Sequence, residues 1–95
     1  MNAYIIADIE VHDLDSYQEY IKQAPSYVEK HQGKYLVRAG NTEVIEGDWQ
    51  PRRLILLEFP SPENAMAFIN DPEYAKVASI RQAAAHTNAV WVEGC

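Results

Sequence analysis

The chain has 95 residues, of which 47% are hydrophobic and 23% are charged, and its formal net charge at pH 7 is −6. This length predicts one domain over residues 1–95, and the composition argues against disorder. The basic residues form no continuous stripe, so we expect neither nucleic acid nor an anionic membrane as a partner. Asp8 and Glu10 interrupt the apolar N-terminal run, which excludes a signal peptide or membrane span there, and the lone Cys95 suits a reducing compartment. The sequence therefore predicts a cytoplasmic protein.

The first elements predicted in chain order are a strand and a long helix. Residues 3–11 are rich in Ile, Val and Tyr, which is typical of a strand. Apolar residues then recur every three or four positions, which indicates a helix capped at its start by Asp13 or Asp15. We expect Gly33 to be the C-terminal cap of this helix.

Two strands follow. The first is predicted from residue 34 to residue 45, with a bend or bulge around Gly40 and Asn41. A turn rich in polar residues and proline then leads into a strand over residues 52–59.

The last part of the chain predicts two helices and a final strand. Ser61 and Asp71 each precede a proline, which is the pattern of an N-cap followed by proline at the first helical position. The final strand is expected over residues 87–93. The resulting order, βαββααβ, predicts an α+β, ferredoxin-like sandwich with a four-stranded antiparallel or mixed sheet. In this topology we expect the first and third strands to form a central, parallel pair.

The predicted strands are apolar on both faces. Residues 54–57 and 89–92 show no alternation of polar and apolar side chains, although the helices can cover only one face of the sheet. Each large apolar side chain contributes about 1.5–3 kcal/mol on burial, so a bare second face would be unfavourable. We therefore expect a homodimer in which a second copy covers this face through a two-fold interface.

Charged residues fall among these apolar strands. Counting with a period of two places Asp8, Arg38 and Glu58 on the face away from the helices. There they would either line a wet pocket or form a structural ion-pair network. Arg81 shares a helix face with Tyr74, two turns away, where it would either bind a carboxylate ligand or pair with an acid such as Glu58.

The remaining candidates are Trp49 and the histidines. Trp49 lies in a turn, where it would be a hairpin or interface anchor or a platform for a ligand. His12, His31 and His86 lack the spacing of metal ligands. The sequence thus predicts no metal site and no cofactor.

Four phrases of the sequence together resemble the bacterial domain-of-unknown-function 1330 family. These are Tyr35-Leu36-Val37-Arg38-Ala39-Gly40, Glu46-Gly47-Asp48-Trp49-Gln50-Pro51-Arg52-Arg53, Leu57-Glu58-Phe59-Pro60-Ser61, and Pro72-Glu73-Tyr74 with Arg81. The resemblance covers essentially the whole chain and implies a dimeric α+β barrel. That superfamily includes cofactor-independent monooxygenases, haem-degrading enzymes, muconolactone-isomerase-like proteins and ligand-sensing modules. The family itself has no settled activity, and Ala39 stands where it favours glycine.

Two functions fit these observations. The first is a small-molecule-binding protein or cofactor-independent enzyme, monooxygenase-like or isomerase-like, with a pocket between the sheet and the helices of each subunit. Its ligand would be small and anionic or enolisable, held by Arg38 and Arg81, with Glu58 or Asp8 as the base if reaction occurs. Tyr74 and Trp49 are further ligand-binding candidates. The alternative is a non-catalytic structural or regulatory homodimer.

Overall fold

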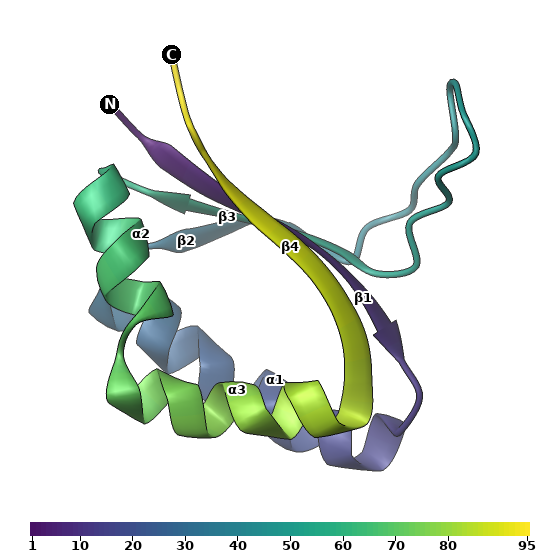
Figure 1. Cartoon of the computed structure of the whole chain (residues 1–95), viewed down its shortest axis with the longest axis horizontal. Coiled ribbons are helices and arrows are strands. Elements are labelled where there is room, and N and C mark those ends of the chain that lie inside the picture. Colours follow the sequence, from purple (N-terminus) through teal and green to yellow (C-terminus); the bar gives the residue numbers. More distant parts are fainter.

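The computed structural model describes residues 1–95 and contains four strands and three helices in the predicted order (Figure 1). The elements are β1 (Ala3–Val11), α1 (Leu14–Lys30), β2 (Lys34–Arg38), β3 (Leu54–Phe59), α2 (Pro62–Ile69), α3 (Pro72–Ala84) and β4 (Ala85–Glu93). The predicted α+β, ferredoxin-like class is confirmed. The final strand begins directly after α3, earlier than the sequence indicated.

The sheet has the strand order β2-β3-β1-β4, and every neighbouring pair is antiparallel. Tyr4 lies opposite Glu58 and Asp8 lies opposite Leu54, so the expected parallel pairing of the first and third strands is wrong. The helix α1 returns the chain to the end of the sheet at which β1 begins, so β2 runs in the same direction as β1. The chain then reverses before β3, which inserts between these two strands.

Each helix begins at a side chain that accepts backbone N–H groups of the first turn. Asp13 has this role for α1, which decides between the two predicted caps. Ser61 caps α2 and Asp71 caps α3, and each is followed by proline at the start of the helix, as predicted. These local interactions fix where the helices start, because they satisfy N–H groups that have no partner within the helix.

The C-terminus of α1 differs from the prediction. Gln32, and not Gly33, has the left-handed conformation, with φ of 65°. The N–H of Gln32 donates to the carbonyl of Glu29, and that of Gly33 donates to Val28, which is a Schellman motif. Glycine is required at position 33 for a different reason, since a Cβ there would lie 2.5 Å from the buried ring of Phe59.

The connection between β2 and β3 is longer than predicted. The strand β2 ends at Arg38, and Ala39 then turns the chain at a φ of 59°, so the expected continuation to residue 45 is wrong. Residues 39–53 contain no helix or strand and project from the body of the molecule (Figure 1). The next strand begins at Leu54.

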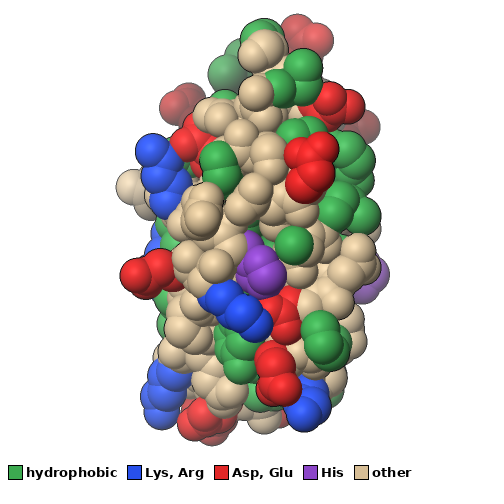
Figure 2. Space-filling view, turned by 90° about the vertical axis from the view of Figure 1, so that its left-hand side faces the viewer, with side chains coloured by type: hydrophobic (Ala, Val, Ile, Leu, Met, Phe, Trp, Pro, Cys, Tyr) green, Lys and Arg blue, Asp and Glu red, His purple; other side chains and the backbone are tan.

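The three helices lie on one side of the sheet, and the core fills the space between the two layers (Figure 1). Phe59, Phe68 and Val77 are buried members of that core, contributed by β3, α2 and α3. Acidic and basic side chains are interspersed on the surface shown in Figure 2, without a continuous basic stripe. No helix has the length and apolar character needed to cross a membrane.

The other side of the sheet has no covering layer in the single chain. Tyr4, Ile6 and Leu56 lie on this outer face, next to Val90 and Val92 of β4. Val90 is 61% exposed and Val92 is 45% exposed. This apolar outer face is the one that the sequence analysis expected a second copy to cover.

Candidate functional site

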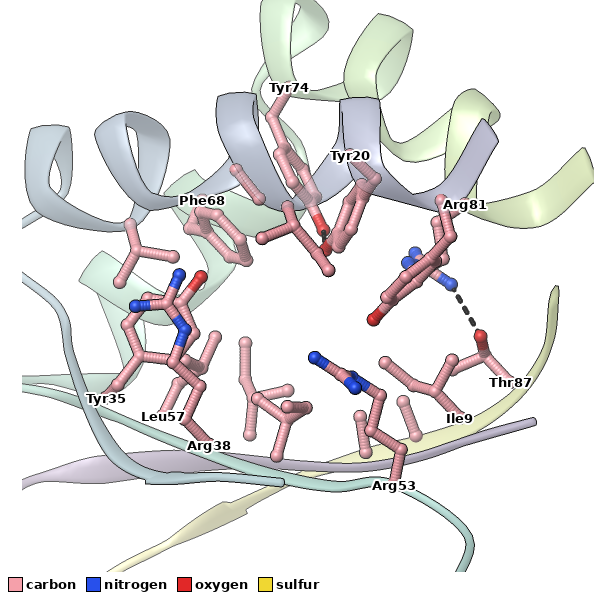
Figure 3. Close-up of a pocket in the computed structure, with 18 residues that line it drawn as sticks. Ile9, Tyr20, Tyr35, Arg38, Arg53, Leu57, Phe68, Tyr74, Arg81 and Thr87 are labelled. Carbon is pink, nitrogen blue, oxygen red and sulfur yellow. Dashed lines mark hydrogen bonds between the residues drawn. The ribbon is translucent and has the colours of Figure 1, made fainter. Parts of the chain in front are cut away.

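A cavity of about 100 Å³ lies between the sheet and the helices (Figure 3). Its walls are mostly apolar, and its polar side chains are arginines, tyrosines and one threonine. The lining residues are Ile5, Ala7, Ile9, Tyr17, Tyr20, Ile21, Ala24, Val28, Tyr35, Arg38, Arg53, Ile55, Leu57, Phe68, Tyr74, Arg81, Thr87 and Ala89. The cavity thus lies where the sequence analysis expected a pocket, but some of its residues were not expected.

Arg38 lines this cavity, and the prediction that it shares the outer face with Glu58 is wrong. Between Tyr35 and Val37 the register of β2 shifts against β3, so that Tyr35 pairs with Leu57 but Arg38 pairs with Ile55. This irregularity adds one residue to β2, and every later side chain changes face. Arg38 therefore points into the layer between sheet and helices.

Three arginines reach the cavity from different elements. The guanidinium carbon of Arg38, at the end of β2, lies 4.3 Å from the ring centre of Tyr35. That of Arg53, directly before β3, lies 5.3 Å from the ring centre of Tyr17, and its buried Nε has no hydrogen-bond partner. Aromatic faces stabilise these cations only partly, because a ring supplies no full negative charge.

Arg81 enters the cavity from α3. Its Nη1 donates a hydrogen bond of 3.0 Å to the Thr87 hydroxyl, and its guanidinium carbon lies 5.4 Å from the ring centre of Tyr20. Burial alone would lower the pKa of Arg81, but the hydroxyls of Tyr20 and Tyr74 hold it above its usual value. Arg81 therefore remains a cation in the cavity.

No carboxylate neutralises these three arginines. The chain has eight basic residues, and the other five each lie within 4.0 Å of an acidic side chain. The paired residues are Lys22, Lys30, Lys34, Arg52 and Lys76. The cavity lining contains no Asp, Glu or His, so its positive charge is unbalanced although the chain as a whole is acidic.

The tyrosines supply hydrogen-bond donors. The hydroxyls of Tyr20 on α1 and Tyr74 on α3 are 2.7 Å apart, and one donates to the other. Burial raises the pKa of Tyr17 and Tyr35, and burial together with the Tyr74 hydroxyl raises that of Tyr20. These three phenols keep their protons at neutral pH. The cavity thus combines cations with neutral donors, a combination suited to an anion.

Asp8 and Trp49 lie on the other side of the sheet. The Asp8 carboxylate accepts hydrogen bonds from Trp49 Nε1 at 2.9 Å and from the backbone N–H groups of Arg52 and Arg53 at 2.9 and 3.4 Å. These bonds lower the pKa of Asp8 against the effect of burial. Asp8 therefore ties the end of the long connection to β1, directly where Arg53 enters the cavity.

Glu58 also faces away from the cavity. Its carboxylate accepts from Asn2 Nδ2 at 3.2 Å and pairs with Lys34 Nζ at 3.3 Å. Of the predicted site residues, the structure brings Arg38, Tyr74 and Arg81 together in the cavity. The other predicted site residues, Asp8, Trp49 and Glu58, do not line the cavity.

Sequence reasoning missed Arg53 and the tyrosines of α1. Arg53 alternates with Ile55 and Leu57, so a period of two already places it on the helix side of β3. Tyr17 and Tyr20 are three residues apart and share a helix face. No group of three or more His, Cys, Asp or Glu side chains is arranged to hold a metal ion.

The chain belongs to the family described as domain of unknown function 1330 (DUF1330), whose model matches residues 2–95. No curated protein matches the sequence at a significant level.

Solved structures share the fold at low sequence identity. RPA0582, a protein of unknown function from Rhodopseudomonas palustris, is 17% identical with a TM-score of 0.80, covering 99% of this chain and 82% of that one. SnoaB, a cofactor-independent oxygenase from Streptomyces nogalater, is 7% identical with a TM-score of 0.68, covering 99% and 93%. A dimeric ferredoxin-like protein of unknown function from Jannaschia sp. CCS1 is 11% identical with a TM-score of 0.66, covering 99% and 100%. At these identities the similarity concerns the fold alone.

Proposed function

We propose that this member of the DUF1330 family binds a small, largely apolar molecule with an anionic group in the cavity between sheet and helices. The observation that carries the proposal is the set of three cavity arginines without a carboxylate partner. A carboxylate or enolate oxygen would accept their N–H groups, while the apolar walls contact the rest of the ligand.

The energetics of the empty cavity support this proposal. A hydrogen bond to a charged group contributes about 1.5–3 kcal/mol, and a buried donor without a partner costs about 1–3 kcal/mol. Arg53 Nε is such a donor. A bound anion that accepts from the same guanidinium group would offset this cost and would reduce the repulsion between neighbouring guanidinium groups. The chain thus carries an unfavourable arrangement that a ligand relieves, which is typical of binding sites.

The same cavity would stabilise negative charge that develops during a reaction. An enolate oxygen placed between the arginines and the Tyr20–Tyr74 pair would accept several hydrogen bonds, as in other sites that stabilise oxyanions. No carboxylate, imidazole or amine lines the cavity to remove a proton. We therefore propose that any catalysis here acts on a ligand that is already anionic or readily enolised. The fold shared with SnoaB, a cofactor-independent oxygenase, supports a reaction without a cofactor. Arg38, Arg81 and Arg53 would stabilise the charge of the ligand, with Asp8 and Glu58 holding the surrounding structure.

The alternative function is a structural or regulatory dimer without a ligand. A sealed and fully ion-paired cluster would favour that function, since charges that only fix an interface need partners. Neither Arg38 nor Arg81 has an acidic partner, and both line a cavity. These contacts favour the binding protein.

We further propose that two chains pair through their apolar outer faces. Val90 and Val92 would then be buried, and each subunit would keep its own cavity on the opposite side of its sheet. The Jannaschia protein with this fold is described as dimeric, which supports the proposal.

Titration with carboxylates and neutral amides of the same shape tests the binding function. We expect propionate and butyrate to bind at low ionic strength and raise the melting temperature, whereas propionamide and butyramide do not. Arg81→Gln should abolish this response. Arg52→Gln is the matched control, because Arg52 is next to Arg53 in sequence but its side chain is 70% exposed and pairs with Glu10. Equal binding of acids and amides, or full binding by Arg81→Gln, would contradict the proposal.

A further inference from the structure

The three cavity arginines are not gathered at one point. Figure 3 shows the guanidinium groups of Arg53 and Arg81 toward one end of the cavity, with Arg38 at the other end beside Tyr35. The hydroxyl of Thr87 lies at the Arg81 end, 3.0 Å from its Nη1.

The effects on neighbouring tyrosines agree with this division. Burial raises the pKa of Tyr17, and the cations of Arg53 and Arg81 both oppose that rise. Burial also raises the pKa of Tyr35, where the opposing cation is Arg38. The pKa of each tyrosine is thus affected by the arginines at its own end of the cavity.

An apolar floor separates the two ends. Arg38 pairs across the sheet with Ile55, and Arg53 is two residues before Ile55 on the same face. The two arginines are therefore diagonal neighbours that both lie next to Ile55, about 7–8 Å apart with their Cβ atoms somewhat closer, as for such positions in a sheet. Their guanidinium groups then diverge, because Arg38 stacks on Tyr35 and Arg53 stacks on Tyr17.

We infer, on the basis of the proposed binding function, that the ligand is a dianion whose two anionic groups are joined by a short apolar spacer. One group binds between Arg53 and Arg81, and the other binds Arg38. A single carboxylate has two oxygens, which the Arg53–Arg81 end already satisfies, so a monoanion leaves Arg38 without a counter-charge. The apolar floor between the ends excludes a strongly polar spacer.

The cavity volume restricts the spacer to a few atoms. A cavity of 150 Å³ accommodates benzene. The space of about 100 Å³ found here is smaller, so it can enclose one carboxylate and a spacer of about two or three carbons, which suits an acid of about four or five carbons. Arg38 is exposed at its end of the site, so the second anionic group can retain contact with water.

Linear acids that differ only in the second carboxylate test this inference. Calorimetric or NMR titrations would compare succinate with butyrate, and adipate with hexanoate, at constant ionic strength. We expect the best dicarboxylate to bind about tenfold or more tightly than the monocarboxylate of equal length, as a charge-assisted hydrogen bond at Arg38 would give. Across malonate, succinate, glutarate, adipate and pimelate, affinity should pass through a maximum, because the two ends of the site are a fixed distance apart.

Arg38→Gln is the decisive variant. It should remove most of the roughly tenfold advantage that the best dicarboxylate has over the monocarboxylate of equal length. Lys34→Gln is the control, since Lys34 is on the same strand and pairs with Glu58 on the outer face. Monocarboxylates that bind as tightly as dicarboxylates would overturn the dianion inference while the binding function stands. Failure of all these acids and of propionate to bind would overturn both.

Discussion

Replacement of Arg53 by methionine should separate the stability of the fold from the function of the cavity. The variant removes a guanidinium group whose buried Nε has no partner, and methionine preserves an unbranched apolar stem of similar length. Removing the unsatisfied donor should stabilise the chain by about 1–3 kcal/mol. The guanidinium carbon of Arg53 lies 5.3 Å from the ring centre of Tyr17, and loss of this contact should cost about 0.5–1 kcal/mol.

The net expectation for Arg53→Met is a gain of about 1 kcal/mol, or about 4–8 °C in Tm for a chain of this size. Urea denaturation monitored by circular dichroism at pH 7 would measure it, with Arg52→Met as the control. That surface change should remain within about 0.5 kcal/mol of the unmodified protein. Carboxylate binding should fall in Arg53→Met although the fold is more stable. A loss of 1 kcal/mol or more would refute the reasoning, because it would mean that Arg53 contributes to the fold.

Three further predictions follow from the same contacts. Arg38→Ala should cost less than about 1 kcal/mol in urea melts, since Arg38 is exposed and has no acidic partner; a loss of about 3–5 kcal/mol would instead indicate a buried ion pair. In sedimentation experiments the unmodified protein should have about twice the 10.8 kDa chain mass, and a monomer at micromolar concentration would contradict the proposed dimer. Val90→Lys on the apolar outer face should give a monomer, whereas Met66→Lys on α2 should not. The pKa of Asp71 is held below its usual value by hydrogen bonds from Lys30, His31 and the first turn of α3, so the ionised side chain stabilises the fold at neutral pH and this stabilisation declines below about pH 4. In urea melts, Asp71→Asn should reduce the loss of unfolding free energy on acidification, and an unchanged pH dependence would refute the assignment.

The sequence by itself determined the order of the elements and the starts of α2 and α3. Ser61 and Asp71 cap α2 and α3 through contacts within the first turn, so neighbouring residues carry all the necessary information. The apolar character of residues 54–57 on both faces likewise indicated a sheet with an uncovered side. Both signals are local, since a cap involves residues of one helical turn and the apolar pattern involves residues of one strand.

Only the tertiary structure decided which side chains meet. Arg38 reaches the cavity because the register of β2 shifts between Tyr35 and Val37, and counting by two fails once a strand gains a residue. Tyr20 and Tyr74 are 54 positions apart, and their hydroxyls approach only because α1 and α3 pack on the same side of the sheet. Ion pairing is decided in the same way, since whether an arginine finds a carboxylate depends on the packing of distant segments. The unbalanced charge of the cavity therefore had no local signature in the sequence.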